Sequence, residues 1–203
     1  MKGIAGIIFV IILSAFSSAK KENSILLHRF IVQPSSKLII SGKTNINSFQ
    51  CSSAYCGRDT LVLQEGGPGY RPIFLKGYVG LDASAFNCGL QMMTADFGKT
   101  IKSKEYPSIS IDFISFERLP IYGCAEEKFK SHLKISLSGV TRSFEVTCSI
   151  EAKNNGQIHL KGGRNFVFSD FNLEAPTRMM GMVKVKETLD VNFHLILELD
   201  TNS

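Results

Sequence analysis

The chain has 203 residues, and its 23 Lys and Arg against 18 Asp and Glu give a net charge of +5. The basic residues are scattered and do not interleave with aromatic residues in a run, so the composition disfavours a nucleic-acid-binding protein. A chain of this length can bury a substantial hydrophobic core, and we expect it to form a single domain.

The N-terminus has the pattern of a secretory signal peptide. Lys2 precedes an almost wholly apolar run over residues 4–13, and the small residues 17–19 offer a cleavage site. The apolar run is short for the roughly 30 Å of hydrocarbon that a membrane-spanning helix must cross. We therefore expect residues 1–19 to be a signal peptide, residues 20–203 to form the domain, and the protein to be periplasmic or secreted.

Most of the remaining chain alternates between apolar and polar residues, which is the pattern of half-buried β-strands. Gly139 and the pair Gly162–Gly163 are expected at strand ends, and Asn154–Asn155–Gly156 predicts a tight hairpin turn. In chain order, the alternation predicts strands within residues 36–42, 42–51, 73–89, 106–113, 132–139, 143–152, 165–171 and 189–199.

One internal stretch predicts a helix. Met93, Phe97 and Ile101 recur at the spacing of one helical face, and Thr94 or Asp96 is expected to cap the helix start. A short helix among six to nine antiparallel strands indicates a β-sandwich or a closed β-barrel.

Four segments match, in order and spacing, the pattern of a known family. They are residues 41–51 (SGKTNINSFQC), residues 86–113 around Asp96-Phe97 and Tyr106-Pro107, residues 133–146 with the turn Gly139-Val140-Thr141, and residues 168–199 with Asp170-Phe171 and Gly181. In these segments the chain resembles the YceI-like family of periplasmic polyisoprenoid-binding proteins, in its Bacteroidetes-type variant. The chain lacks the tryptophan that the family usually shows near the start, and residues 65–72 depart from the pattern. These departures bear on the ligand more than on the fold.

The resemblance implies an all-β fold, an antiparallel lipocalin-like β-barrel of about eight strands with one short helix. It also implies an amphiphilic lipid partner, such as a polyisoprenoid, a quinone or a fatty-acid-like chain, with no other cofactor, and it allows a homodimer. Inward positions of a small barrel either fill the core or line a cavity, and periodicity alone does not separate the two. The residues expected to form the ligand wall are Phe49, Phe86, Ile111, Phe113, Leu133, Ile135, Phe144, Val146, Phe166, Phe168, Phe171 and Phe193.

The five cysteines are expected to form disulfides, because the signal peptide places the chain in an oxidising compartment. In the YceI-like interpretation, Cys51 and Cys88 share the local pattern Phe-x-Cys on strand segments, so a bond between them is the first choice. Cys124 and Cys148 are the second expected pair, which leaves Cys56 unpaired. A bond between Cys51 and Cys56 remains as an alternative.

An enzyme is a competing hypothesis. Its acidic residues to test first are Asp96, Asp170 and Glu187, because each lies in a family-like segment. No Ser, His and Asp set occupies a recognisable nucleophile elbow, so we expect no catalytic residue. We also expect no metal site, because the histidines stand apart from one another and from cysteine pairs in the sequence: His28, His132, His159 and His194.

Two further alternatives concern the surface of the barrel. An outer-membrane barrel would need strands of about 9–11 residues with apolar residues facing outward. Here several predicted strands are short and the polar faces carry Lys and Glu, so we expect no insertion into a membrane. A structural or interaction barrel with a filled core and no small ligand remains as the alternative to a lipid carrier.

Overall fold

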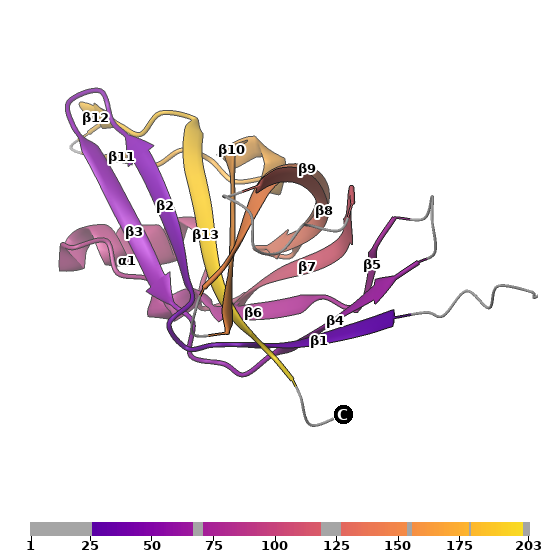
Figure 1. Ribbon diagram of the computed structural model, residues 1–203. Coiled ribbons are helices and arrows are strands. Elements are labelled where there is room, and N and C mark those ends of the chain that lie inside the picture. The colour runs from indigo at the N-terminus through magenta and orange to yellow at the C-terminus, as the bar shows by residue number, and fades with distance from the viewer. Residues whose placement is uncertain (1–25, 67–70, 119–126, 154–155, 179, 201–203) are drawn as a thin grey trace, which may run out of the picture.

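The computed structural model describes residues 26–66, 71–118, 127–153, 156–178 and 180–200. The predicted signal peptide, residues 67–70 of the 65–72 loop and Asn154–Asn155 of the predicted turn lie outside these ranges. Within them the chain forms mainly β-strands, with one α-helix (Figure 1).

The elements follow the chain as a series of antiparallel strands interrupted once by the helix. They are β1 (Leu26–Val32), β2 (Lys37–Lys43), β3 (Ser48–Ala54), β4 (Thr60–Glu65), β5 (Ile73–Lys76), β6 (Tyr78–Asp82), the 3-10 helix η1 (Ala83–Ala85), α1 (Gln91–Thr100), β7 (Ser108–Phe116), β8 (Glu127–Leu137), β9 (Val140–Ala152), β10 (Gln157–Val167), the 3-10 helix η2 (Phe168–Phe171), β11 (Thr177–Arg178), β12 (Val183–Lys184) and β13 (Thr188–Leu199).

Eight strands close into an antiparallel barrel. Their order is β1-β4-β5-β7-β8-β9-β10-β13, and β13 pairs back with β1, with Phe30 opposite Leu199 and Val32 opposite Leu197. The expected barrel of about eight strands with one short helix is confirmed. Closure pairs the backbone groups of the edge strands through hydrogen bonds, so these eight strands need no further element to protect a free sheet edge.

In the half of the barrel formed by β2, β3, β6 and the first parts of β7 and β13, the strands pair in a different order. The first part of β13 pairs with β2, and β2 pairs with β3, while the first part of β7 pairs with β6. The edges of this half meet where Ser52 of β3 and Asn87 exchange two backbone hydrogen bonds of 2.9 Å. We call this contact, with the adjacent Cys51–Cys88 disulfide, the seam.

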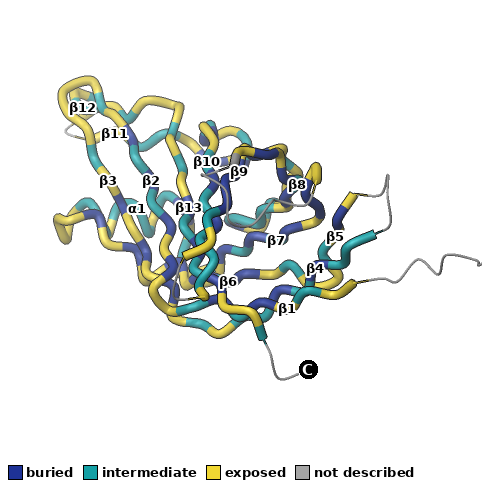
Figure 2. Tube along the Cα trace, viewed as in Figure 1, coloured by how far each residue is buried: buried dark blue, intermediate teal, exposed yellow. Residues whose placement is uncertain are grey.

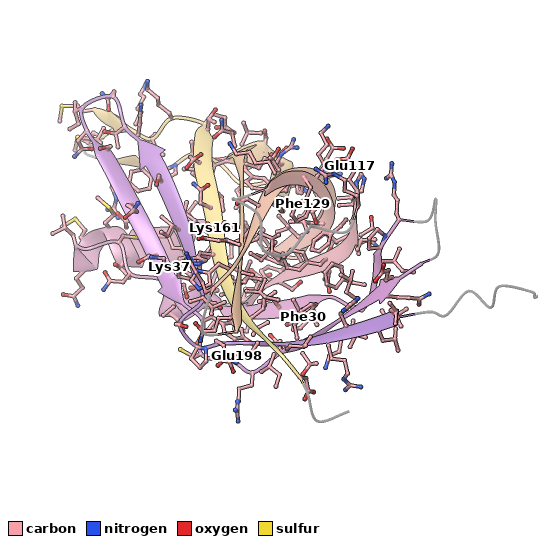
Figure 3. All side chains as sticks on the ribbon, viewed as in Figure 1. Phe30, Lys37, Glu117, Phe129, Lys161 and Glu198 are labelled. Atoms are coloured by element: carbon pink, nitrogen blue, oxygen red, sulfur yellow. A yellow bond between two sulfur atoms is a disulfide. The ribbon has the colours of Figure 1, made fainter. Side chains whose placement is uncertain are left out.

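Buried residues alternate with less buried ones along strands such as β2 and β7 (Figure 2), as expected when every second residue faces the barrel interior. Phe30 of β1 and Phe129 of β8 are buried, whereas Lys37 of β2 and Glu198 of β13 are exposed on the same barrel (Figure 3). A one-residue shift of register would reverse these faces, so the hydrophobic pattern specifies the pairing.

One part of the barrel interior is filled by packed aromatic rings. Phe116 contacts Phe74 edge-on with ring centroids 5.0 Å apart and Phe129 at 4.8 Å. Phe113 contacts Phe74 at 5.6 Å and Phe193 at 5.7 Å. We call these five rings the aromatic plug. Edge-to-face pairs of this kind add packing energy to the area they bury.

Two local predictions were wrong. Helix α1 begins at Gln91 with Leu90 at its N-cap and no side-chain cap, so Thr94 and Asp96 lie inside the helix. Gly162 and Gly163 lie within β10 rather than at a strand end. A Cβ atom at Gly162 would overlap the ring of Phe193, so this glycine allows a close approach inside the strand.

Candidate functional site

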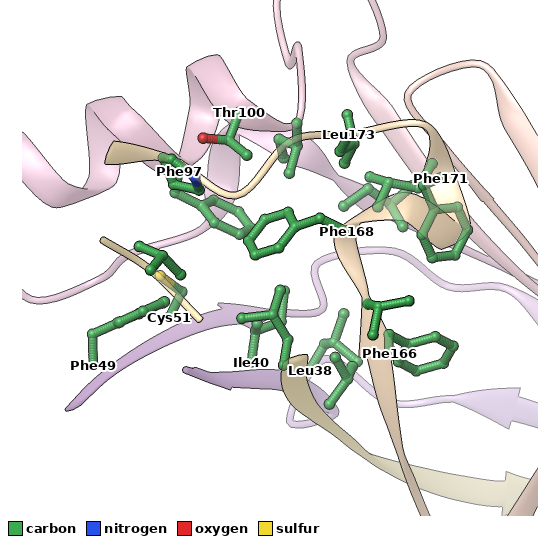
Figure 4. A pocket seen from close by; sticks show the side chains of 18 of the residues that line it. Leu38, Ile40, Phe49, Cys51, Phe97, Thr100, Phe166, Phe168, Phe171 and Leu173 are labelled. Atoms are coloured by element: carbon green, nitrogen blue, oxygen red, sulfur yellow. The ribbon is translucent and has the colours of Figure 1, made fainter. Parts of the chain in front are cut away.

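The end of the barrel away from the aromatic plug is hollow. A cavity of about 440 Å³ lies between the inward-facing strand residues and a cover formed by α1 and the segment after η2 (Figure 4). Its lining is almost wholly apolar, and its volume lies within the roughly 300–1,000 Å³ that is typical of small-molecule sites. We therefore take this cavity as the candidate site.

The strands supply the cavity wall. The wall residues come from seven strands and mostly occupy alternate positions, because only every second side chain of a strand faces the interior. From β2, β3, β7, β8, β9, β10 and β13 they are Leu38, Ile40, Phe49, Cys51, Ile109, Ile111, Leu133, Ile135, Leu137, Val146, Phe166, Leu189, Val191 and Phe193.

The cover consists of α1 on one side and a segment that we call the strap, residues 172–178 and 180–187, on the other. Met93, Phe97 and Ile101 turn the apolar face of α1 toward the cavity, as the sequence spacing predicts. Phe168 of η2 and Leu173 of the strap complete the cover (Figure 4). Figure 4 shows the rings of Phe97 and Phe168 close together on the side of the cavity opposite Leu38 and Ile40.

The strap is attached to the turn between β2 and β3 by several hydrogen bonds. The Asn45 side chain donates to the Met182 carbonyl at 2.8 Å and accepts from the Lys184 backbone at 2.9 Å. The Lys186 backbone donates to the Lys43 carbonyl at 2.8 Å. Through these bonds the turn and the strap form a continuous rim of the cavity, which residues of both line.

A second attachment joins the strap to α1. Arg178 of β11 forms an ion pair with Asp96 of α1, and both residues line the cavity. The Asp96 carboxylate is partly shielded and the guanidinium is more exposed. The pair therefore places charge at the cavity mouth, which we define by four of the solvent-exposed lining residues, Asn47, Leu90, Met92 and Arg178.

Arg164 of β10 is a further charged lining residue, and its position is set by aromatic rings. Its guanidinium carbon lies 5.1 Å from the Phe144 ring centroid and 5.9 Å from that of Phe166, and its Nη1 donates to the Glu145 carbonyl at 2.9 Å. Cation–π contacts of this length are attractive. The charge is thus held on the aromatic faces at the cavity edge.

Nine of the twelve residues predicted as the ligand wall line the cavity. Phe86, Phe113 and Phe144 do not. Each of these three instead packs against a ring that does: Phe86 against Phe97 at 5.1 Å, Phe113 against Phe193 at 5.7 Å and Phe144 against Phe166 at 4.9 Å. The nine that line it are Phe49, Ile111, Leu133, Ile135, Val146, Phe166, Phe168, Phe171 and Phe193.

Sequence reasoning missed the strap and the helix as sources of lining residues. Met92, Met93, Phe97, Pro176 and Val185 lie at the cavity but belong to no alternating strand pattern. The helical spacing was a usable signal for α1. The strap has two strands of only two residues each, so no periodic signal marks it.

The three acidic residues of the enzyme hypothesis each have a structural partner. Asp96 pairs with Arg178. Asp170 accepts a hydrogen bond from the Val167 backbone at 3.0 Å and so caps η2, and Glu187 accepts from the Ser169 backbone at 3.1 Å. These contacts explain the acidic side chains through local structure.

The Cys51–Cys88 disulfide is confirmed. The alternative bond to Cys56 is not formed, and Cys56 is an exposed free thiol, as expected. The second expected pair was wrong: Cys148 is a buried free thiol, and Cys124 lies outside the described residues. Burial raises the pKa of the Cys148 thiol to about 12.

Two histidines that are isolated in the sequence meet in the structure. His159 of β10 and His194 of β13 lie with Nδ1 and Nε2 3.0 Å apart. Burial lowers the pKa of both imidazoles, and nearby lysines add to the effect. Among the described residues, no group of three or more His, Cys, Asp or Glu side chains is placed to hold a metal ion.

Comparison with solved structures identifies the fold. BcnA of Burkholderia cenocepacia superposes with a TM-score of 0.60 at 17% identity, covering 81% of this chain and 98% of BcnA. A polyisoprenoid-binding domain from Saccharophagus degradans, implicated in plant cell wall breakdown, superposes with a TM-score of 0.61 at 14% identity, covering 84% and 98%. The YceI protein of Campylobacter jejuni reaches 0.50 at 17% identity, covering 64% and 74%. The chain has the YceI-like barrel fold.

The fold that the sequence resemblance implies is therefore confirmed by structure. No protein-family model and no curated protein matches the sequence. Within the described part of the YceI-like barrel, no helix is long and apolar enough to cross a membrane.

Proposed function

We propose that this YceI-like barrel is a binding protein that encloses the apolar chain of an amphiphilic lipid, such as a polyisoprenoid, a quinone or a fatty-acid-like chain. The observation that carries the proposal is the apolar cavity of about 440 Å³ beneath α1 and the strap. Each methylene moved from water into such a cavity contributes roughly 0.8 kcal/mol, so a chain can be held without a charged anchor.

The distribution of polar groups supports an amphiphile over a fully apolar ligand. Asp96, Arg178 and Arg164 lie at the edge of the cavity, whereas its wall is formed by aliphatic and aromatic side chains. A lipid would therefore place its tail between the wall and the cover and its polar head at the mouth. The Saccharophagus degradans neighbour, which is a polyisoprenoid-binding domain, supports the same class of ligand.

The cavity also favours a carrier over a filled structural barrel. The aromatic plug and its buried neighbours fill only one part of the interior, and the inward residues of the other part surround a space. Protein interiors are normally close-packed, so an apolar cavity of this size favours a function in ligand binding. The structural partners of Asp96, Asp170 and Glu187 support a function without catalysis.

We further propose that the protein works in the periplasm or outside the cell. The signal-peptide pattern of residues 1–19 and the Cys51–Cys88 disulfide support this location, because structural disulfides persist in oxidising compartments. Intact-mass measurement of the exported protein tests it, with a mature chain beginning at Lys20 as the expected result. A chain that retains residues 1–19 would contradict it.

The binding proposal is tested by native mass spectrometry on protein purified from an exporting bacterial host. We expect an adduct of a prenyl lipid, a quinone or a fatty acid, either carried through purification or taken up from a panel of these compounds. Val146→Phe places a larger side chain in the cavity and should abolish the adduct. Val79→Ile adds volume at a fully buried position that does not line the cavity and should retain it.

The paired variants separate loss of space from loss of packing. Val79→Ile overpacks a filled part of the core, which costs typically about 1–3 kcal/mol, whereas Val146→Phe extends into the cavity and takes up room for a ligand. A wild-type protein that stays free of adducts across the whole panel would overturn the proposal, as would equal binding by both variants.

A further inference from the structure

The cavity mouth is bordered by unusually exposed apolar side chains. Ile46 in the β2–β3 turn, Leu90 and Met92 at the start of α1, and Met180 and Met182 in the strap are between 65% and 105% exposed. We call these five residues the mouth cluster. A single exposed apolar residue on a protein surface needs no explanation, but a group around the entrance of an apolar cavity does.

The members of the mouth cluster come from three segments that the structure holds together. Asn45, next to Ile46, bonds to the Met182 carbonyl at 2.8 Å, and Arg178 of the strap pairs with Asp96 of α1. Leu90 and Met92 themselves line the cavity. Figure 1 shows the ends of β2 and β3, β11 and β12, and α1 on one side of the barrel, away from β4 and β5.

Met180 has a further feature that packing does not explain. Its backbone φ is +56°, and Gly181 beside it has φ +89°, so the two form the tip of the β11–β12 turn. Asn and Gly are preferred at such positions, since a bulky side chain is strained there. The side chain is fully exposed, so it gains no contact within the described chain that would offset the strain.

Basic residues flank the mouth cluster. Lys43 at the end of β2, Lys184 of β12 and Lys186 of the strap are exposed, and none of them forms an ion pair with another described residue. Val183 and Val185 alternate with the two strap lysines and line the cavity, so the lysines belong to the opposite, outer face of the strap. Apolar tips beside free lysines match the chemistry of an anionic lipid surface.

We propose that the mouth cluster docks the protein on an anionic phospholipid bilayer, with Ile46, Met180 and Met182 inserted among the acyl chains and the three lysines at the headgroups. The inference rests on the proposed function for its purpose, since a docked mouth would let a lipid tail pass into the cavity without crossing water. A bilayer suits projecting side chains from separate turns, because it accepts them without a complementary shape. A protein partner would instead require a packed patch with matching pockets.

The test is co-sedimentation of the mature protein with vesicles of phosphatidylglycerol and phosphatidylethanolamine. The mouth variant combines Ile46→Ser, Met180→Asn and Met182→Ser, in which Asn tolerates the positive φ of position 180. We expect its apparent affinity for the vesicles to fall about tenfold or more. Added salt should weaken wild-type binding, because the headgroup contacts of lysines are screened.

The matched control variant combines Leu27→Ser and Leu75→Ser. These residues are also exposed and apolar, but they lie on β1 and β5, away from the mouth. The control should bind the vesicles like the wild type. A wild type that does not sediment with the vesicles, or a mouth variant that binds as tightly as the control, would overturn the inference and leave a protein partner as the occupant.

A second measurement separates this inference from the proposed function. Filling of the cavity is followed in vesicle-free solution with a fluorescent fatty acid, cis-parinaric acid, for all three proteins. We expect equal filling in the three, with slower uptake from vesicles only in the mouth variant. A wild type that binds vesicles but not the probe would overturn the proposed function, whereas probe filling without any vesicle binding would overturn the docking surface alone.

Discussion

Cys51 of β3 and Cys88, six residues beyond the end of β6, are joined by a disulfide at the seam where two strand edges of the barrel meet. Within the described chain, the one backbone pairing across this seam is that of Ser52 with Asn87, through two hydrogen bonds of 2.9 Å. Cys51 also lines the cavity. The covalent bond therefore supports the cavity wall at the place where hydrogen bonding is sparse.

Replacing both seam cysteines by serine should destabilise the protein. The bond closes a loop with a sequence separation of 37 residues, and its loss should lower the free energy of unfolding by about 2–4 kcal/mol. Urea denaturation at equilibrium measures this value. Cys56→Ser is the control, because Cys56 is exposed and unpaired and its loss should change stability by less than about 0.5 kcal/mol. Equal midpoints for the two variants would contradict the structural role of the seam.

Breaking the ion pair between Arg178 and Asp96 should affect the strap more than the fold. A partly exposed pair contributes at most about 1 kcal/mol to stability, so Arg178→Gln should unfold nearly as the wild type does. The strap would lose its attachment to α1, and a bound fluorescent fatty acid should dissociate several-fold faster in a stopped-flow displacement experiment.

Exchanging the two charges provides the control for this pair. The double variant Asp96→Arg with Arg178→Asp restores an attraction between α1 and the strap, so it should recover slow dissociation. Asp96→Asn should behave like Arg178→Gln. Dissociation rates that are the same in all of these variants would show that the strap does not retain the ligand.

The alternating pattern predicted most strands of the barrel but not the two strands, β1 and β4, that close it. The strands β7, β8, β9 and β13 follow clean alternation, because one face of each is buried. No strand was predicted at β1 or β4, although these two complete the ring of eight. The first four residues of β1 are exposed or half-buried despite the apolar pair Leu26–Leu27, so its pattern does not report the buried face.

The cavity itself was beyond prediction from periodicity. Phe113 and Phe193 both lie on strands, face inward and belong to the aromatic plug, yet only Phe193 also lines the cavity. Whether an inward ring meets another ring or a void depends on residues across the barrel. The order of the strands in the sequence does not show which residues face each other across the barrel. The alternating pattern therefore identified inward residues but could not predict whether each one packs against another side chain or lines a cavity.

The two free thiols should differ sharply in reactivity. Thiolates are the reactive form, and burial raises the pKa of Cys148 to about 12, so almost none of it is ionised at pH 8. We expect iodoacetamide at pH 8 to label Cys56 within minutes and to leave Cys148 unlabelled in the native protein. Peptide mapping by mass spectrometry measures both sites, and labelling in urea shows that Cys148 becomes reactive on unfolding. Equal native labelling of the two would contradict the burial of Cys148.

The histidine pair predicts a loss of stability in mild acid. Burial lowers the pKa of His159 and His194 below the ordinary value of 6.5, and Lys161 adds to the effect on both. The unfolded chain, whose histidines keep the ordinary pKa, therefore takes up protons first as the pH falls. The pair's contribution is fully present above pH 6.5 and is progressively lost below it.

The prediction is checked by urea denaturation at pH 7.5 and pH 5.5. The wild type should lose stability between these values, and the double variant His159→Gln with His194→Gln should lose less. Each single variant should fall between them, because the remaining imidazole is still partly buried but no longer faces a second one across a 3.0 Å contact. A carboxylate away from the pair whose pKa is lowered, such as that of Glu145, is shared by all variants and cancels in the comparison. An unchanged pH dependence in the double variant would show that the pair does not set it.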